Sequence, residues 1–292
     1  MGSESAEDVA RIEKLSFWTP EANIEPISGG ISNLNYKVTT PSRAYVVRFA
    51  DDDPVHHIER KREARIARAA HEAGLSPRVV IAENGVFALE WIEARPMSDA
   101  DLNDPRQLTR IAELIRRCHQ DMPQHVSGPT PGFWPPHMIR VHIAQLSKAG
   151  DAFEKRFPDD LKALSSLETI AAPHEIAFCH NDMMAGNILD DGTRLWLIDW
   201  EYAGFNAPLY DLANLISNNA LGPEVERHLL NAYFSSPPTD EVMRKYTALK
   251  AMSALREALW SRVARETSPV SFDYDAYAQQ FFDQFDEIVR TL

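Results

Sequence analysis

Two aspartates and one asparagine stand at suggestive distances in the stretch HNDMMAGNILDDGTRLWLID, residues 180–199. Asp182 precedes Asn187 by five positions, and Asp199 follows twelve positions later. A carboxylate can accept the proton of an attacking hydroxyl, and oxygen atoms of Asp and Asn are good ligands for Mg²⁺. The spacing therefore indicates phosphoryl transfer, a reaction that needs a base, metal ligands and neutralised phosphate charge.

Two apolar strands are expected to hold these side chains in place. The first covers 176–180 and the second 194–199, and Asp191-Gly192 supplies the turn of a hairpin. Asp199 then lies at the end of a buried strand, where a carboxylate is costly unless it is paired or bound to a metal. Asn and Asp also serve ordinary turns, but their occurrence together between two apolar strands favours a site.

The composition excludes several classes of protein. The 292 residues, 44% of them apolar, suit one or two domains. Acidic residues outnumber basic ones, 43 to 30, and the formal net charge of −13 argues against nucleic acid as a partner. With two cysteines, no apolar signal core and no apolar run of about 18 residues, we expect a cytoplasmic protein without membrane insertion.

The expected elements divide the chain into a small β-rich part and a larger helical part. β-Branched and aromatic residues predict strands at 35–40 and 44–50, and a hairpin over 78–93. The proline-rich stretch 127–137 is expected to be a loop. Periodic apolar residues predict helices over 8–18, 54–75, 104–120, 139–157, 208–220, 224–234, 240–265 and 274–292. Ligands often bind in the cleft between two such lobes.

The motifs FCHNDMMAGNIL and LIDWEYAGFNAPLYDLAN resemble those of choline and ethanolamine kinases, within the larger aminoglycoside-phosphotransferase-like family. That family's loop has the pattern H-x-D-x-x-x-x-N, and the choline kinase branch adds D-[FYW]-E-Y, an aromatic-Asn pair and D-x-x-N. This chain has Asp199-Trp200-Glu201-Tyr202, Phe205-Asn206 and Asp211-Leu212-Ala213-Asn214. The resemblance extends from about residue 28 onward.

The resemblance implies an α+β, protein-kinase-like fold with two lobes. Residues 1–93 would form the nucleotide-binding lobe, a small antiparallel β-sheet with one long helix. Residues 94–292 would form a larger, mainly helical lobe that carries the catalytic and acceptor-binding residues, and the linker would lie at about 89–96.

The resemblance also implies roles for the residues of the catalytic stretch. Asp182 would be the catalytic base, and Asn187 and Asp199 would be ligands of Mg²⁺ or Mn²⁺. Glu201, at the second acidic position of the metal motif, would assist them. His180 would either orient the loop by hydrogen bonding or be an ordinary core histidine with satisfied hydrogen bonds, and the second role is favoured.

ATP is expected to bind through the first lobe. Gly29 and Gly30 would let backbone N–H groups approach the phosphates, and the resemblance to S-G-G-[IL]-[ST]-N places Ser32 and Asn33 near them. Arg48 takes the place of the strand lysine of protein kinases and can bind phosphate with two parallel hydrogen bonds.

A helix glutamate should pair with Arg48. Glu59 and Glu63 are both candidates, and the residue types alone do not decide between them. The position in the family's helix favours Glu63. The neighbouring basic residues Arg60, Lys61, Arg62, Arg65 and Arg68 are interpreted as a solvated face. The linker residues Glu90, Trp91 and Ile92 would meet adenine through their backbone.

The acceptor pocket is expected on the C-terminal helices, where the family has a W-x-x-W element followed by a tyrosine. Trp260 and Tyr277 match the second tryptophan and the tyrosine, and Tyr202 is added to this set. Glu257 stands in place of the first tryptophan, so an aromatic cage for a quaternary ammonium would be incomplete. A glutamate can pair with a cation by charge, and it equally suits a primary amine.

The function implied is ATP-dependent phosphorylation of the hydroxyl of a small cationic amino alcohol, with choline first and ethanolamine second. An aminoglycoside or other small-alcohol phosphotransferase is the alternative in the same class. A non-catalytic nucleotide-binding pseudokinase is disfavoured because base, metal ligands and phosphate loop are all present. A protein kinase is disfavoured because the D-F-G and A-P-E segments are missing. The sequence does not distinguish a monomer from a homodimer.

Overall fold

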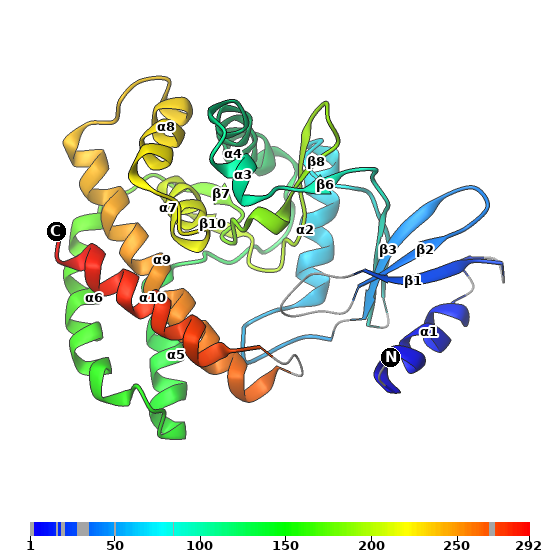
Figure 1. The fold of residues 1–292 in the computed structure, drawn as a ribbon, viewed down its shortest axis with the longest axis horizontal. Coiled ribbons are helices and arrows are strands. Elements are labelled where there is room, and N and C mark those ends of the chain that lie inside the picture. The colour runs from blue at the N-terminus through cyan, green and yellow to red at the C-terminus, as the bar shows by residue number, and fades with distance from the viewer. Residues whose placement is uncertain are drawn as a thin grey trace.

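A five-stranded antiparallel sheet forms one end of the molecule, with the spatial order β1-β2-β3-β5-β4 (Figure 1). The computed structural model describes residues 3–15, 17–18, 21–27, 35–49, 51–83, 85–268 and 272–292. The strands are β1 Asn23–Ile27, β2 Asn35–Thr39, β3 Ala44–Phe49, β4 Val79–Glu83 and β5 Val86–Glu90. Two helices accompany them, α1 Ser3–Glu13 and α2 Arg60–Glu72.

Strand alternation gives this sheet two different faces. Tyr36, Val38 and Val47 are buried on one face, in an apolar cluster that includes Ile12 of α1. The intervening residues of β3, Arg48 among them, point to the other face, because successive side chains of a strand lie on opposite sides. Arg48 is thereby turned toward α2 and the second lobe.

Residues 91–94 lead from β5 into the helical lobe, where β6 Arg95–Pro96 pairs with β8 Ile188–Asp190. The strand β8 forms a hairpin with β9 Leu195–Leu197, and β7 Ala177–Cys179 pairs with β10 Gly204–Asn206. A Cβ on Gly204 would lie 2.6 Å from the carbonyl oxygen of Pro131, so only glycine allows residues 131–133 to pack against β10.

The helical lobe is built around one long helix, α9. Its buried residues lie on every side because α5, α6, α7 and α10 all pack against it. The helices of this lobe are α3 Asp99–Leu102, α4 Pro105–His125, α5 Pro135–Ala149, α6 Phe157–Ala171, α7 Pro208–Asn218, α8 Pro223–Phe234, α9 Asp240–Thr267 and α10 Tyr274–Val289. Two short 3₁₀ turns are η1 Glu154–Arg156 and η2 Ala185–Asn187.

The α+β, two-lobed fold expected from the sequence is confirmed, but two expected elements near the middle of the chain are wrong. The helix expected over 139–157 ends at Ala149, because Gly150 takes a φ of +69° and terminates α5. The 3₁₀ turn η1 follows, and α6, which begins at Phe157, was not expected from the sequence. The last residues of the expected loop, Pro135 and Pro136, form the first turn of α5, where a missing N–H costs nothing.

The long helix of the first lobe is shorter than expected. α2 begins at Arg60, and the preceding residues form a turn closed by the bridge between Asp53 and Ile58. Within the described residues, none of the helices combines the length and apolar character needed to cross a lipid bilayer.

Candidate active site

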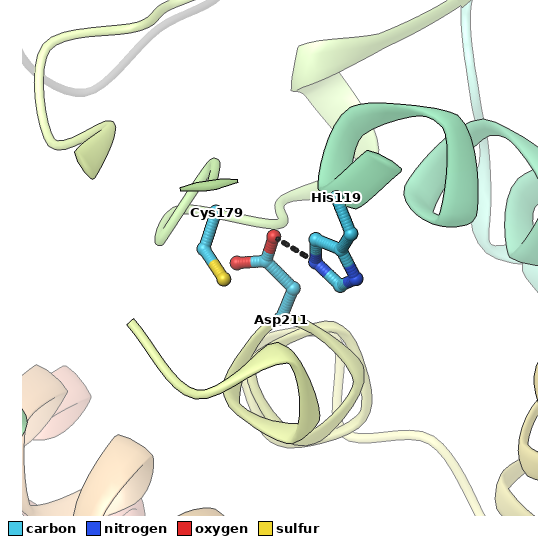
Figure 2. Close-up of side chains that lie close together, drawn as sticks. All are labelled: His119, Cys179 and Asp211. Atoms are coloured by element: carbon cyan, nitrogen blue, oxygen red, sulfur yellow. Dashed lines mark hydrogen bonds and ion pairs between the residues drawn. The ribbon is translucent and has the colours of Figure 1, made fainter. Parts of the chain in front are cut away.

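The loop that follows β7, residues 180–187, is held from beneath by Asp211 of α7 (Figure 2). One carboxylate oxygen, Oδ1, accepts the backbone N–H of Asn181 at 2.8 Å. The other, Oδ2, accepts the backbone N–H of His180 at 2.9 Å and lies 3.0 Å from Nε2 of His119. Because Asp211 is fully buried, these charge-assisted hydrogen bonds fix the start of the loop relative to α7.

Two asparagines of the same helix region hold the middle of the loop. Asn214 accepts the backbone N–H of Met183 at 2.5 Å, and Asn219 accepts that of Ala185 at 2.9 Å. The D-x-x-N motif of α7 carried no expected role in the sequence, and neither His119 nor Asn219 was expected at the site. The motif is the signal that could have identified Asp211 and Asn214 as residues that position the loop.

Asp182 and Asn187, five residues apart in the loop, are in direct contact. The side-chain amide of Asn187 donates to the backbone oxygen of Asp182 at 3.0 Å and to its Oδ2 at 3.1 Å. Burial raises the pKa of Asp182 well above its ordinary value, and the charges of Glu257, Asp199 and Glu201 raise it further, against the lowering effect of Arg256. A carboxyl group with a raised pKa is a stronger base when it is ionised.

Asp199 is brought beside this pair by backbone hydrogen bonds. The N–H of Ile198 donates to the carbonyl of Asn187 at 3.0 Å, and Nε2 of His180 donates to the carbonyl of Ile198 at 3.0 Å. His180, which is fully buried, therefore ties the loop to the residue before Asp199, which is the orienting role of the two considered. Asp199 itself has a φ of +68°, an uncommon conformation for a residue other than glycine and one that is frequent at functional sites.

The two lobes meet through Arg48, which forms an ion pair with the buried Glu63 of α2. Its Nη1 lies 3.5 Å from Oδ1 of Asp199 in the other lobe. Glu59, the other candidate, is exposed and lies 3.6 Å from Arg62. The choice that the residues left open is thus decided in favour of Glu63.

Only some of the basic residues of α2 form the solvated face that the sequence suggested, since Lys61 and Arg68 are exposed. Nη1 of Arg60 lies 2.8 Å from a carboxylate oxygen of Glu63 and 2.8 Å from one of Glu201. Arg65 donates to the backbone oxygens of Ser127 and Pro129. The interpretation fails for Arg60 and Arg65 because their side of α2 faces the second lobe, and only the packing of the lobes decides that.

Glu201 therefore lies against Arg60, with one oxygen engaged by a cation. Burial raises the pKa of Glu201 to about 7, with a further contribution from the charge of Asp199. Asp199 is the more exposed of the two carboxylates, with 24% of its side chain accessible against 7% for Glu201. Asp199 is thus better placed to bind a ligand that enters from the cavity.

A cavity of about 370 Å³ lies between the lobes. Arg48, Glu63 and Leu89 line it from the first lobe, and Asn187, Asp199 and Trp200 line it from the second. The linker residues Glu90, Trp91 and Ile92 also border it, although the Glu90 side chain forms ion pairs with Arg43 and Arg78. The cavity thus joins the expected adenine-binding linker to the catalytic loop.

Four residues expected at the ATP phosphates, Gly29, Gly30, Ser32 and Asn33, lie outside the described residues. The residues on either side of that segment, Ile27 and Asn35, line the cavity.

Two groups of side chains could be considered for a metal ion. Asn187 and Asp199 offer oxygen atoms at the cavity, which suits Mg²⁺ or Mn²⁺. His119, Cys179 and Asp211 also lie close together (Figure 2). There both oxygens of Asp211 already accept hydrogen bonds, and burial raises the pKa of the Cys179 thiol well above its usual range. The side chains of that cluster serve to hydrogen-bond the loop. The oxygen atoms of Asn187 and Asp199 at the cavity fit a divalent cation better.

The four residues expected at the acceptor pocket lie together although they come from different segments. Nε1 of Trp260 donates to the Tyr202 hydroxyl at 3.1 Å, and the Tyr277 hydroxyl donates to Glu257 at 3.0 Å. Arg256, which the sequence analysis passed over, joins the two pairs. It donates to Glu257 at 2.9 Å and lies over the Tyr202 ring at 4.5 Å. We call these five residues the acceptor cluster.

Comparisons with known proteins identify the family and the fold of the chain. The model of the phosphotransferase enzyme family matches residues 23–246. A probable ethanolamine kinase of Arabidopsis thaliana is 25% identical over 91% of this chain and 78% of its own length. The solved structure of a choline/ethanolamine kinase family protein from Mesorhizobium loti is 27% identical, with a TM-score of 0.78 over 97% of this chain and 94% of that one. Choline kinase LicA from Streptococcus pneumoniae, 21% identical over the full length of both chains, shares the fold with a TM-score of 0.81.

Proposed function

The chain belongs to the phosphotransferase enzyme family and is an alcohol phosphotransferase, and on this premise we propose that it transfers the γ-phosphoryl group of ATP to the hydroxyl of a small amino alcohol. The observation that carries the proposal is the contact between Asp182 and Asn187, because Asn187 lines the cavity between the lobes together with Asp199 and Arg48. This arrangement supplies a base, oxygen ligands and a phosphate-binding cation within one site.

In the proposed reaction each residue has a separate task. Asp182 accepts the proton of the acceptor hydroxyl while that oxygen attacks the γ-phosphorus. Asn187 keeps the Asp182 carboxylate in place through its amide hydrogen bond. Arg48, held by Glu63, binds phosphate oxygens. Asn187 and Asp199 would hold Mg²⁺ or Mn²⁺, which neutralises negative charge on the phosphates.

The acceptor cluster supports an amine as the recognition group of the substrate. The carboxylate of Glu257 stands where the choline kinase pattern has a tryptophan, and it can accept hydrogen bonds from an ammonium that carries N–H groups. The quaternary ammonium of choline has none to donate. Among the acceptors named by the relatives, the cluster therefore favours ethanolamine over choline.

An ADP-release assay with a panel of acceptors tests the proposal. Ethanolamine or another amino alcohol should stimulate ADP release, and excess EDTA should abolish it. Choline and aminoglycosides in the same panel identify the alternatives. If no amine or other alcohol stimulates ADP release above the background ATPase rate, the proposed function is wrong.

A further inference from the structure

Arg256 of α9 is a buried guanidinium whose hydrogen-bonding capacity is only partly used. Its exposed fraction is 2%. Nη1 donates to Glu257, whereas Nε and Nη2 have no hydrogen-bond partner within the described part of the chain. A buried donor without a partner destabilises a protein, and a charged donor does so more strongly. The free energy lost at Nε and Nη2 is recovered if a bound ligand accepts hydrogen bonds from these two groups.

Another arginine of the same helix shows what a purely structural role looks like. Arg262 is equally buried, at 2% exposure. Its Nε and Nη2 donate to Asp151 at 3.0 and 2.8 Å, and its Nη1 pairs with Asp275. Every nitrogen of that guanidinium has an acceptor, so burial in α9 does not by itself leave the donors of an arginine unused.

The position of Arg256 ties its free donors to the acceptor cluster. The guanidinium lies over the ring of Tyr202 and pairs with Glu257, which in turn binds Tyr277. Tyr202 is also joined to the catalytic loop, because the side-chain amide of Asn181, the residue before Asp182, donates to the Tyr202 backbone oxygen at 3.0 Å. A group bound at Arg256 is therefore bound beside the loop that carries Asp182.

Unpartnered buried imidazoles lie on the same side of the site. Both ring nitrogens of His142 and Nδ1 of His56 lack a hydrogen-bond partner among the described residues. The two rings are 6.3 Å apart, and that of His56 is 5.7 Å from Trp260. Burial lowers the pKa of both histidines, and the charge of Arg256 lowers them further, so both are neutral and Arg256 supplies the positive charge.

We propose that the acceptor is a hydroxylated α-amino acid, whose carboxylate binds Arg256 and whose ammonium binds Glu257. Nη1 of Arg256 and Oε2 of Glu257 are 2.9 Å apart, and an α-amino acid likewise carries its two charged groups on one carbon. A simple amino alcohol would satisfy Glu257 and leave Nε and Nη2 of Arg256 unpaired. This inference rests on the proposed function and names the chemical class of its acceptor.

The reaction is balanced without any further co-reactant. The side-chain hydroxyl oxygen forms a bond to the γ-phosphorus of ATP, and the bond from that phosphorus to the bridging oxygen of ADP breaks. The hydroxyl proton goes to Asp182. The products are ADP and the O-phosphorylated amino acid.

Matched acceptors that differ only in the carboxylate test the inference. Serine is ethanolamine with an added carboxylate, and homoserine bears the same relation to propanolamine. In at least one pair, the wild-type enzyme should show a kcat/KM for the amino acid on the order of 100-fold above that for its partner, because a site built for a charged group rejects an analogue without it. Arg256→Gln should bring that ratio close to one.

Arg262→Gln is the matched control, because it removes an equally buried arginine from the same helix outside the acceptor cluster. It should lower the melting temperature and leave the ratio between the paired acceptors unchanged. Arg256→Lys keeps a positive charge but loses the planar fork of donors, so it should lower the ratio to an intermediate value. The kcat/KM ratio between paired acceptors is measured on the wild-type enzyme. It therefore tests the inference even if Arg256→Gln does not fold.

Two unfavourable outcomes are distinguishable. If ethanolamine and propanolamine are both phosphorylated as well as or better than their carboxylated partners, the inference is wrong and the proposed function stands. If neither amino alcohols nor hydroxylated amino acids stimulate ADP release, both are wrong.

Discussion

Arg48 of the sheet lobe and Asp199 of the helical lobe face each other at the cavity, with 3.5 Å between Nη1 and Oδ1. Each is held within its own lobe, because Arg48 pairs with Glu63 and Asp199 lies two residues after the end of β9. The contact links the phosphate-binding cation to the expected metal ligand. The relative position of the two lobes therefore determines whether the site is assembled.

Replacing Arg48 should weaken nucleotide binding more than acceptor binding. A charge-assisted hydrogen bond to phosphate is worth about 1.5–3 kcal/mol, so Arg48→Gln should raise the KM for ATP by roughly 10- to 100-fold. Steady-state kinetics with ATP as the varied substrate measures this. Glu59→Gln is the control, because Glu59 is exposed and away from the cavity, and it should leave that KM unchanged. An unaltered KM in Arg48→Gln would remove Arg48 from the phosphate site.

Asp182→Asn should lower kcat by about 10²- to 10⁴-fold, the usual contribution of a general base, while the affinity for ATP is retained. Because burial raises the pKa of Asp182 well above its ordinary value, wild-type kcat should fall as the pH is lowered through that raised pKa. ADP release across a pH series and calorimetric titration with ATP measure the two effects. Near-normal turnover of the variant would exclude Asp182 as the base.

The same substitution should change stability in a direction fixed by the raised pKa. Above the ordinary pKa of an aspartate, the unfolded chain releases this proton while the folded protein still holds it, so the carboxyl group costs stability as the pH rises toward the folded-state value. Asp182→Asn lacks this cost. Its melting temperature at neutral pH should therefore exceed that of the wild type, and the difference should shrink in acid.

Asp199 and Glu201 should differ in their effect on the metal requirement. Asp199→Asn should raise the Mg²⁺ concentration for half-maximal activity by at least about tenfold, since a carboxylate is a much better ligand for Mg²⁺ than an amide. Glu201→Gln should raise it less, because Glu201 is more deeply buried and engaged by Arg60. Titration of activity with MgCl₂ separates the two. If both substitutions raise the Mg²⁺ concentration for half-maximal activity equally, Glu201 contributes to metal binding as much as Asp199.

Removing the buried carboxylate of Asp211 should disturb the catalytic loop. Asp211→Ala leaves two backbone N–H groups and His119 without their acceptor, which should cost about 3–5 kcal/mol in the free energy of unfolding and lower kcat. Asp160→Ala is a matched control, because Asp160 is also buried and pairs with Arg156 away from the loop. Urea unfolding should show a loss of stability in both variants, and kcat should fall only in Asp211→Ala.

The sequence by itself determined the features that depend on neighbours along the chain. The spacing of Asp182 and Asn187 places both in one loop, and the strand before Asp199 is short enough to return that carboxylate to the loop. The alternation of side chains between the two faces of β3 and the turn at Gly85, with a φ of +73°, were equally predictable from the sequence. Strand pleating and turn geometry are local properties. The division into a sheet lobe and a helical lobe follows from such local patterns.

Only the tertiary structure decided which charged side chains meet. Helix α2 has charges on several sides, and the packing of the lobes turns Glu63 and Arg60 inward while Glu59 stays exposed. Arg256 is an ordinary residue of a helix by sequence, yet the helices around α9 bury it beside Tyr202 and Glu257. Local spacing cannot encode these pairings, because each depends on how segments far apart in the sequence pack against one another.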